Sequence, residues 1–113
     1  MTASPRIVVA VAPVDLRRGL DALCAEIQYG LALNPFDGTW YLFRNKAGTR
    51  LKLVAFDGTG FWLGYRRLER GTWVWPKAGD RVMTLSVPQF LVLVQGQDWR
   101  RIQVPEGIRP SLI

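Results

Sequence analysis

Residues 40–76, WYLFRNKAGTRLKLVAFDGTGFWLGYRRLERGTWVWP, decide the fold of this 113-residue chain. Turn signals at residues 45–49, 57–60 and 69–71 separate four runs that are rich in β-branched and aromatic residues. The stretch therefore predicts an antiparallel β-meander. With seven cations against two carboxylates, it also carries five of the six net positive charges of the chain.

The segments on either side of the meander predict a strand on the N-terminal side and two helices. Residues 7–12 form an apolar run that is typical of a buried strand, and a short strand is expected at residues 81–85. Asp15 is expected to cap a helix whose apolar positions recur every three or four residues. Ser86 and Gln89 have the spacing of a capping box, and Gly96 is a natural stop for that second helix. The predicted fold class is α+β, an antiparallel β-meander of four to five strands plus an N-terminal strand, packed with two helices.

The length predicts one α+β domain over residues 1–104, followed by a loosely ordered tail over residues 105–113, which contains two prolines. The first apolar run is too short for a signal peptide or a membrane span, so we expect a soluble, cytoplasmic protein. A pI near 10.3 favours a polyanionic partner, with nucleic acid first and an anionic membrane surface second.

The sequence contains no histidine and one cysteine, so a zinc site or a histidine-based catalytic triad lacks its ligands and its base. We expect no cofactor and no metal. Most of the carboxylates fall at predicted helix caps or tight turns, where acids have structural roles. An enzyme with a carboxylate-bound metal therefore remains only as a minor alternative.

Short loops fix the register of the predicted strands. A two-residue loop at Gly58-Thr59 pairs residue 56 with residue 61, and a three-residue loop ending at Gly71 pairs residue 67 with residue 73. Closing the loop after residue 44 pairs residue 44 with residue 50. One face of the sheet is then expected to present a candidate nucleic-acid-binding set: Arg44, Arg50, Lys52, Tyr65, Arg67, Trp73 and Trp75. Arg17, on the predicted first helix, is expected to lie away from this face.

Two interpretations of this basic face stay open. Arginines that alternate with aromatic rings are typical of a platform that neutralises phosphates and stacks on bases. The alternative is a solvated face on which the arginine side chains cover the rings in intramolecular cation–π pairs. The apolar end of the same face is expected to be covered by the C-terminal segment or by a second protein, and its candidate protein-interface residues are Trp40, Phe56, Phe61 and Leu63.

An ordered set of short motifs resembles a known family. It comprises residues 13–19 (PVDLRRG), 34–38 (NPFDG), Lys52, 57–60 (DGTG), 66–71 (RRLERG), 75–76 (WP) and 96–99 (GQDW). The chain is similar over nearly its whole length to TnpB, the small accessory protein encoded by the second open reading frame of IS66-type insertion sequences.

The resemblance implies a non-enzymatic accessory factor for DNA transposition that acts beside a separate transposase. It provides no catalytic residues. The expected partners are DNA, with weak sequence preference, and the transposase of the same element, with a homo-oligomer as a further option and no membrane partner. The alternative is an adaptor that docks on the transposase without binding DNA itself.

Overall fold

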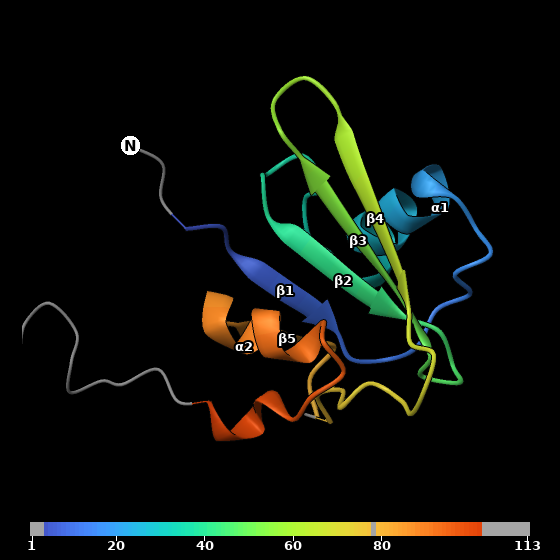
Figure 1. Ribbon diagram of the computed structural model, residues 1–113. Coiled ribbons are helices and arrows are strands. Elements are labelled where there is room, and N and C mark those ends of the chain that lie inside the picture. The colour runs from blue at the N-terminus through green and yellow to red at the C-terminus, as the bar shows by residue number, and fades with distance from the viewer. Residues whose placement is uncertain (1–3, 78, 103–113) are drawn as a thin grey trace, which may run out of the picture.

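The computed structural model describes residues 4–77 and 79–102 and shows one five-stranded sheet with helices on both faces (Figure 1). The strand order is β4-β3-β2-β1-β5. β1 runs parallel to β2, and the other neighbouring pairs are antiparallel. The elements are β1 (Ile7–Ala10), α1 (Leu20–Ala25), the π-helix η1 (Glu26–Gly30), β2 (Trp40–Arg44), β3 (Arg50–Phe56), β4 (Phe61–Arg67), β5 (Val82–Leu85), α2 (Val87–Leu93) and the 3₁₀-helix η2 (Trp99–Arg101).

This architecture confirms the predicted α+β class, although the sheet is mixed rather than purely antiparallel. β1 is buried along its whole length between β2 and β5, as expected for a continuous apolar run. The expected tail over residues 105–113 lies outside the described residues. No helix in the described part of the chain is long and apolar enough to cross a membrane.

The first helix starts later than the sequence predicts. Gly19 is its N-cap, and no side chain caps it. Asp15 instead closes a tight turn upstream, where its carboxylate accepts the backbone N–H of Arg17 at 3.0 Å. Leu23 and Ile27 then pack beneath the sheet, and Cys24 lies half-buried beside them. Burial raises the pKa of the Cys24 thiol, which fits a small core residue.

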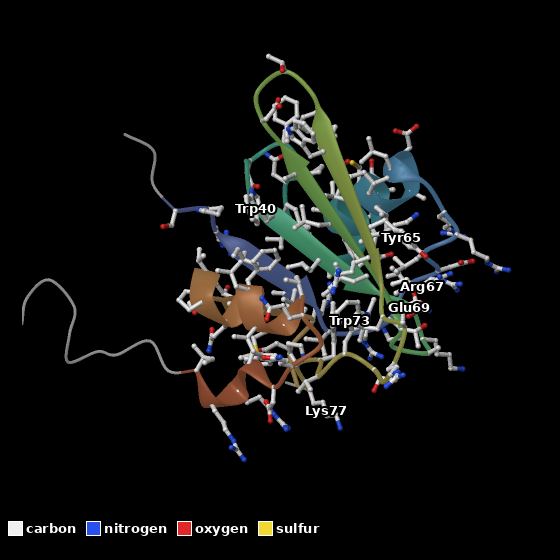
Figure 2. All side chains as sticks on the ribbon, in the orientation of Figure 1. Trp40, Tyr65, Arg67, Glu69, Trp73 and Lys77 are labelled. Carbon is white, nitrogen blue, oxygen red and sulfur yellow. The ribbon has the colours of Figure 1, made fainter. Side chains whose placement is uncertain are left out.

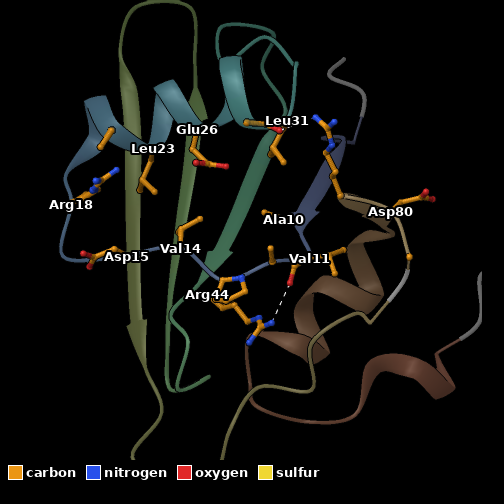
Figure 3. A pocket seen from close by; sticks show the side chains of 16 residues that line it. Ala10, Val11, Val14, Asp15, Arg18, Leu23, Glu26, Leu31, Arg44 and Asp80 are labelled. Atoms are coloured by element: carbon orange, nitrogen blue, oxygen red, sulfur yellow. Dashed lines mark hydrogen bonds between the residues drawn. The ribbon is translucent and has the colours of Figure 1, made fainter.

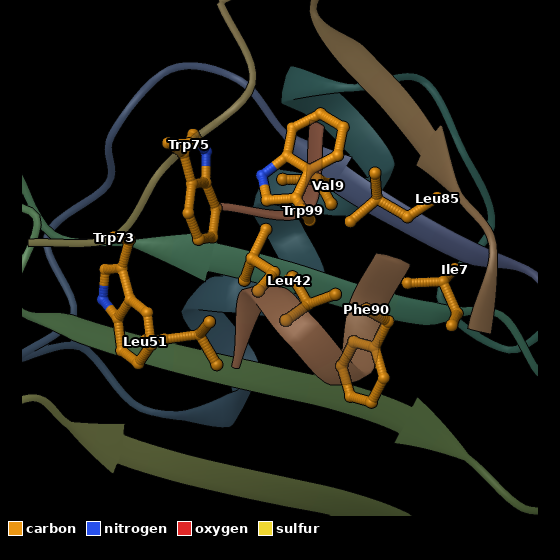
Figure 4. Close-up of a cluster of buried hydrophobic side chains, with 10 residues drawn as sticks. Ile7, Val9, Leu42, Leu51, Trp73, Trp75, Leu85, Phe90 and Trp99 are labelled. Atoms are coloured by element: carbon orange, nitrogen blue, oxygen red, sulfur yellow. The ribbon is translucent and has the colours of Figure 1, made fainter. Parts of the chain in front are cut away.

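The second helix follows the sequence prediction closely. The Ser86 hydroxyl accepts the Gln89 N–H, and the Gln89 side chain accepts the Ser86 N–H, so the capping box is present. Gly96 adopts a φ of 78° just after the helix. The core on this side of the sheet gathers residues from both ends of the chain (Figure 4): Ile7, Val9, Leu42, Leu51, Trp73, Trp75, Leu85, Phe90, Leu93 and Trp99.

The prediction of a fourth meander strand at residues 72–76 was wrong. Gly71 adopts the expected positive φ of 72°, but the chain then leaves the sheet instead of pairing with β4. The N–H of Trp73 bonds to the carbonyl of Gly48, and the indole of Trp75 donates to the carbonyl of Ala10 at 2.8 Å. The segment thereby closes the core on the α2 side of the sheet.

The predicted register of β2 against β3 was wrong by one residue. Arg44 pairs with Leu51 rather than with Arg50, because Asn45 joins the ladder and its side chain closes the loop onto the N–H groups of Thr49 and Arg50. A one-residue shift turns every side chain of a strand to the other face. Arg44 therefore lies on the opposite face from Lys52.

Candidate nucleic-acid interface

A basic groove lies on the α1 side of the sheet. It runs along the part of that face that α1 leaves uncovered. Its volume is about 1110 Å³, and one wall is the segment of residues 13–17 while the other comes from β3, β4 and the β2–β3 loop. Of the described residues, four cations and one carboxylate line it, which gives a net charge of three positive units. The charged and aromatic side chains of the groove are Asp15, Arg17, Lys46, Arg50, Lys52 and Tyr65.

The register of β3 and β4, which the structure confirms, places the central groove residues. Arg50 lies opposite Arg67, and Lys52 lies opposite Tyr65. The Nε of Arg50 donates to the Tyr65 hydroxyl at 3.0 Å, and this bond crosses the sheet surface. Because this bond uses Nε, it leaves the terminal nitrogens of Arg50 available to an outside acceptor.

Lys52 joins the two walls of the groove. Its Nζ donates to the backbone carbonyl of Arg18 at 3.2 Å. An ammonium group has three donors, so one bond to a carbonyl leaves others for a ligand. Within the described ranges, the three ion pairs involve neither Lys52 nor Arg50 nor Lys46. These three charges are therefore not neutralised by a carboxylate of the described chain.

Asp15, the one acid that lines the groove in the described part of the chain, is paired within its own turn. Asp15 accepts two side-chain hydrogen bonds from Arg17, each at 2.9 Å. These bonds, with the N–H of Arg17, lower the pKa of Asp15 to about 2 and raise the pKa of Arg17. The pair is exposed, with 91% of the Arg17 side chain accessible to solvent. Arg17 thus contributes less free positive charge to the groove than Arg50 does.

Arg67 lies at the end of β4, beside the groove but not in it. Its Nε donates to the Glu69 carboxylate at 2.9 Å, which raises the pKa of Arg67. Glu69 therefore offsets part of the repulsion that Arg67 experiences from Arg50 across the strands.

The structure brings together some of the predicted nucleic-acid-binding residues and separates the others. Arg50, Lys52, Tyr65 and Arg67 share one face, as expected. Trp73 (Figure 2) and Trp75 (Figure 4) were expected beside them, but they are 5% and 6% exposed in the core, so their predicted position was wrong.

Arg44 is the third displaced residue. It lines a second pocket of about 620 Å³ and donates to the carbonyl of Val11 at 3.2 Å (Figure 3). This pocket lies between residues 10–15, the first helical segment and residues 79–81, and its charges are mixed: Asp15, Arg18, Glu26, Arg44, Asp80 and Arg81. A mixed set of this kind does not attract one class of ligand by charge.

The predicted apolar patch is divided between the two faces. Trp40 packs edge-on against Phe90 on the α2 side, so its expected position beside Phe56 was wrong. Phe56 and Phe61 are neighbours as predicted, and the ring of Phe36 packs edge-on against both at 5.1 Å. The chain therefore supplies part of the cover that was expected from another segment or another protein. Leu63, which is 41% exposed, lines the basic groove instead.

The sequence-based prediction missed two of the cations that line the groove. Arg17 was expected to lie away from the basic face, but it lines the groove because its segment is a turn rather than a helix. Lys46 lies in the β2–β3 loop at the other end. The signal for Arg17 was Asp15 two residues before it, a spacing that also suits an Asx turn.

The carboxylates are at turns, as their sequence positions predict. Asp37, Asp57 and Asp98 each accept the N–H of the residue two positions further along. Asp57 also accepts the indole N–H of Trp62, and these bonds lower its pKa to about 2. Within residues 4–77 and 79–102, no three acidic or cysteine side chains are grouped so that they could hold a metal ion.

Comparison with known proteins gives one family and two curated relatives. The model of the family described as IS66 Orf2 like protein matches residues 5–104. The uncharacterized protein y4hO of Sinorhizobium fredii is 38% identical over 108 residues, which cover 96% of this chain and 92% of that one. The uncharacterized protein y4jC of the same organism is 36% identical with the same coverage. No solved structure matches significantly.

Proposed function

The chain belongs to the IS66 Orf2 like family of transposition accessory proteins, and on that premise we propose that it binds DNA phosphates through the basic groove. The observation that carries the proposal is the position of Arg50, Lys52 and Lys46 in one groove, where no described carboxylate pairs with them. Like charges that are adjacent on a sheet repel each other and destabilise the free protein. A bound polyanion would offset this repulsion.

The groove suits the phosphate backbone better than the base edges. The described surface consists of two strands, the turn at residues 13–17 and the β2–β3 loop, and it offers no helix of the length that enters a major groove. Arg50 presents a planar fork, and Tyr65, which is 56% exposed, presents a ring beside it. Such a surface contacts phosphates and sugars with weak sequence preference. In this role the protein is a non-enzymatic factor that works beside the transposase of the same element.

The test is the salt dependence of binding to a fluorescent duplex of arbitrary sequence, measured by anisotropy. Wild-type affinity should fall as salt rises, because each neutralised phosphate releases roughly 0.9 of a counterion. Replacing Arg50 with Ala should weaken binding by a similar factor on unrelated duplexes and reduce the logarithmic salt slope by about one unit.

The matched control is Arg101→Ala. Arg101 belongs to η2, which packs with α2 on the other side of the sheet, and its loss changes the net charge by the same amount. It should leave affinity and slope nearly unchanged. Equal losses in the two variants would mean that net charge alone accounts for binding, and the groove would then have no special role. Absent or salt-independent wild-type binding would favour the adaptor that docks on the transposase.

A further inference from the structure

In the part of the chain that the structure describes, the outer edge of the sheet at β4 is open over a full strand. Among the described residues, β4 pairs only with β3, and six of its seven residues are exposed while the first is half-buried. Edge strands usually carry a proline, a bulge or a lysine in the middle, which blocks pairing with another strand. The middle of β4 is instead Leu63-Gly64-Tyr65, and its charges are confined to one end. The edge is therefore competent to accept a further strand.

The hydrogen bonds of the β3–β4 hairpin identify the free backbone groups. Asp57 bonds to Gly60 at the turn, and Leu68 bonds to Thr49 at the far end. In an antiparallel ladder the inward and outward groups alternate along the strand. Even-numbered residues of β4 thus bond to β3, and the N–H and C=O groups of four odd-numbered residues point outward: Phe61, Leu63, Tyr65 and Arg67.

We propose that the occupant of this edge is β4 of a second copy of the chain, paired antiparallel about Gly64. This register uses the whole strand, and it sets Gly64 opposite its own equivalent at a two-fold axis. Each Leu63 then exchanges hydrogen bonds with the partner's Tyr65, and each Phe61 with the partner's Arg67. All four outward residues of each copy are bonded.

The charges of β4 are compatible with this pairing. Trp62, which is 67% exposed, comes opposite the partner's Arg66 on the α2 face, and the two-fold axis repeats the contact. The Nε of Arg66 is held by the carbonyl of Val94 at 2.6 Å, so its guanidinium is already fixed on that face. No cation lies opposite another cation. Shifting the axis to residue 66 would set the two Arg66 side chains against each other.

The same symmetry has a consequence for the basic groove. A two-fold axis perpendicular to the sheet keeps corresponding faces of both copies on one side. The two grooves would then lie on the same surface of a continuous sheet. This dimer does not depend on DNA binding, so its test uses the protein alone.

The first measurement is the molar mass of the wild type by light scattering over a range of concentrations. We expect it to rise from 12.8 kDa toward twice that value. A mass that stays at 12.8 kDa at every concentration would overturn the proposal.

Disulfide trapping tests the register. In the proposed pairing Gly64 is a non-hydrogen-bonded pair, whose Cα atoms lie roughly 4.5 Å apart, within the range that a disulfide spans. A Cβ at Gly64 would meet Leu53 only at an ordinary 3.6 Å, so cysteine fits there. In a Cys24→Ala background, Gly64→Cys should cross-link at least about tenfold faster than Thr59→Cys at the exposed hairpin tip, because association raises the local thiol concentration. Equal rates would contradict this register.

Two substitutions at Trp62 provide a matched pair. Both remove the indole, but Trp62→Arg sets a cation opposite the partner's Arg66 while Trp62→Glu sets an acid there. The arginine variant should dimerise at least about tenfold more weakly than the glutamate variant, since like charges that face each other across strands are destabilising. Circular dichroism verifies that both are folded. The same dimerisation constant for both would show that Trp62 is outside the interface.

Discussion

The two faces of the sheet are covered in different ways. On the α2 side, Trp73, Trp75 and Trp99 close the core from a returning segment and from η2. On the α1 side, the helix covers only the end near Leu23 and Ile27, and beyond it the sheet surface carries Arg50 and Lys52. The closed face thus accounts for much of the stability, and the open face is free to carry charge at little cost to the fold.

This difference shows where substitutions should act. Residues of the closed face should change stability and leave DNA affinity alone in molecules that remain folded. Residues of the open face should change affinity and leave stability alone. A substitution that changes both would break the division.

The largest effect is expected for Trp75→Ala on the closed face. It removes a side chain that is 6% exposed and leaves the carbonyl of Ala10 without its indole donor. Truncating a buried aromatic residue costs about 3–5 kcal/mol of unfolding free energy. Urea denaturation measures the loss. Trp62→Ala is the matched control, because that indole is 67% exposed and its loss should cost less than about 1 kcal/mol.

The role of Trp75 was not predictable from local sequence. The alternation Thr72-Trp73-Val74-Trp75 fits an exposed strand as well as a buried covering segment. The hydrogen bond that decides between them joins Trp75 to Ala10, which is 65 residues away. By contrast, the register of β3 and β4 was predictable because the two-residue loop at Gly58-Thr59 allows only one pairing.

The candidate nucleic-acid-binding site, like the fold, was predictable only in part. Arg50, Lys52, Tyr65 and Arg67 share a face because their register follows from one short turn. The prediction placed Arg44 on the wrong face because the sequence allows Asn45 to be either a loop residue or the last residue of the strand pairing. The second wall of the groove, which contains Arg17, depends on a tertiary contact across the sheet face. The hydrophobic periodicity of the sequence does not predict such a contact.

A moderate effect is expected at the start of α2. Ser86→Ala removes the hydroxyl that accepts the N–H of Gln89, and such a loss costs about 1 kcal/mol. Ser86→Asp keeps an acceptor at the N-cap and should retain most of the stability. Thermal unfolding followed by circular dichroism compares the two variants. DNA affinity at a temperature where both are folded should match the wild type, and a loss of affinity would contradict the division between the faces.

A smaller, local effect concerns acid and the tip of the β3–β4 hairpin. The backbone N–H groups of Thr59 and Gly60, followed by the indole of Trp62, hold the pKa of Asp57 near 2, below its ordinary value of 3.8. Because the pKa of Asp57 is lower in the folded state than in the unfolded state, its carboxylate stabilises the fold at any pH above the unfolded-state pKa. That contribution is lost as the pH falls through about 2. The Trp62 indole N–H resonance should therefore shift with a midpoint near pH 2. Asp57→Asn should abolish the titration, and a shift that persists in this variant would assign it to another group.

The smallest expected change is in the opposite direction, toward tighter binding. Asp15 is the only carboxylate among the described residues that lines the groove, and it neutralises Arg17 within the same turn. Asp15→Asn keeps an acceptor for the N–H of Arg17, so the turn should persist, but it releases the guanidinium and raises the charge of the groove by one. Affinity for an arbitrary duplex should rise, and the logarithmic salt slope should steepen by up to about one unit.

The matched control is Asp98→Asn, because Asp98 makes the same kind of ion pair with Arg100 and accepts the same backbone bond at η2, away from the groove. If both variants bind equally tightly, net charge explains the gain. If only Asp15→Asn gains, Arg17 contacts the phosphates from the second wall of the groove.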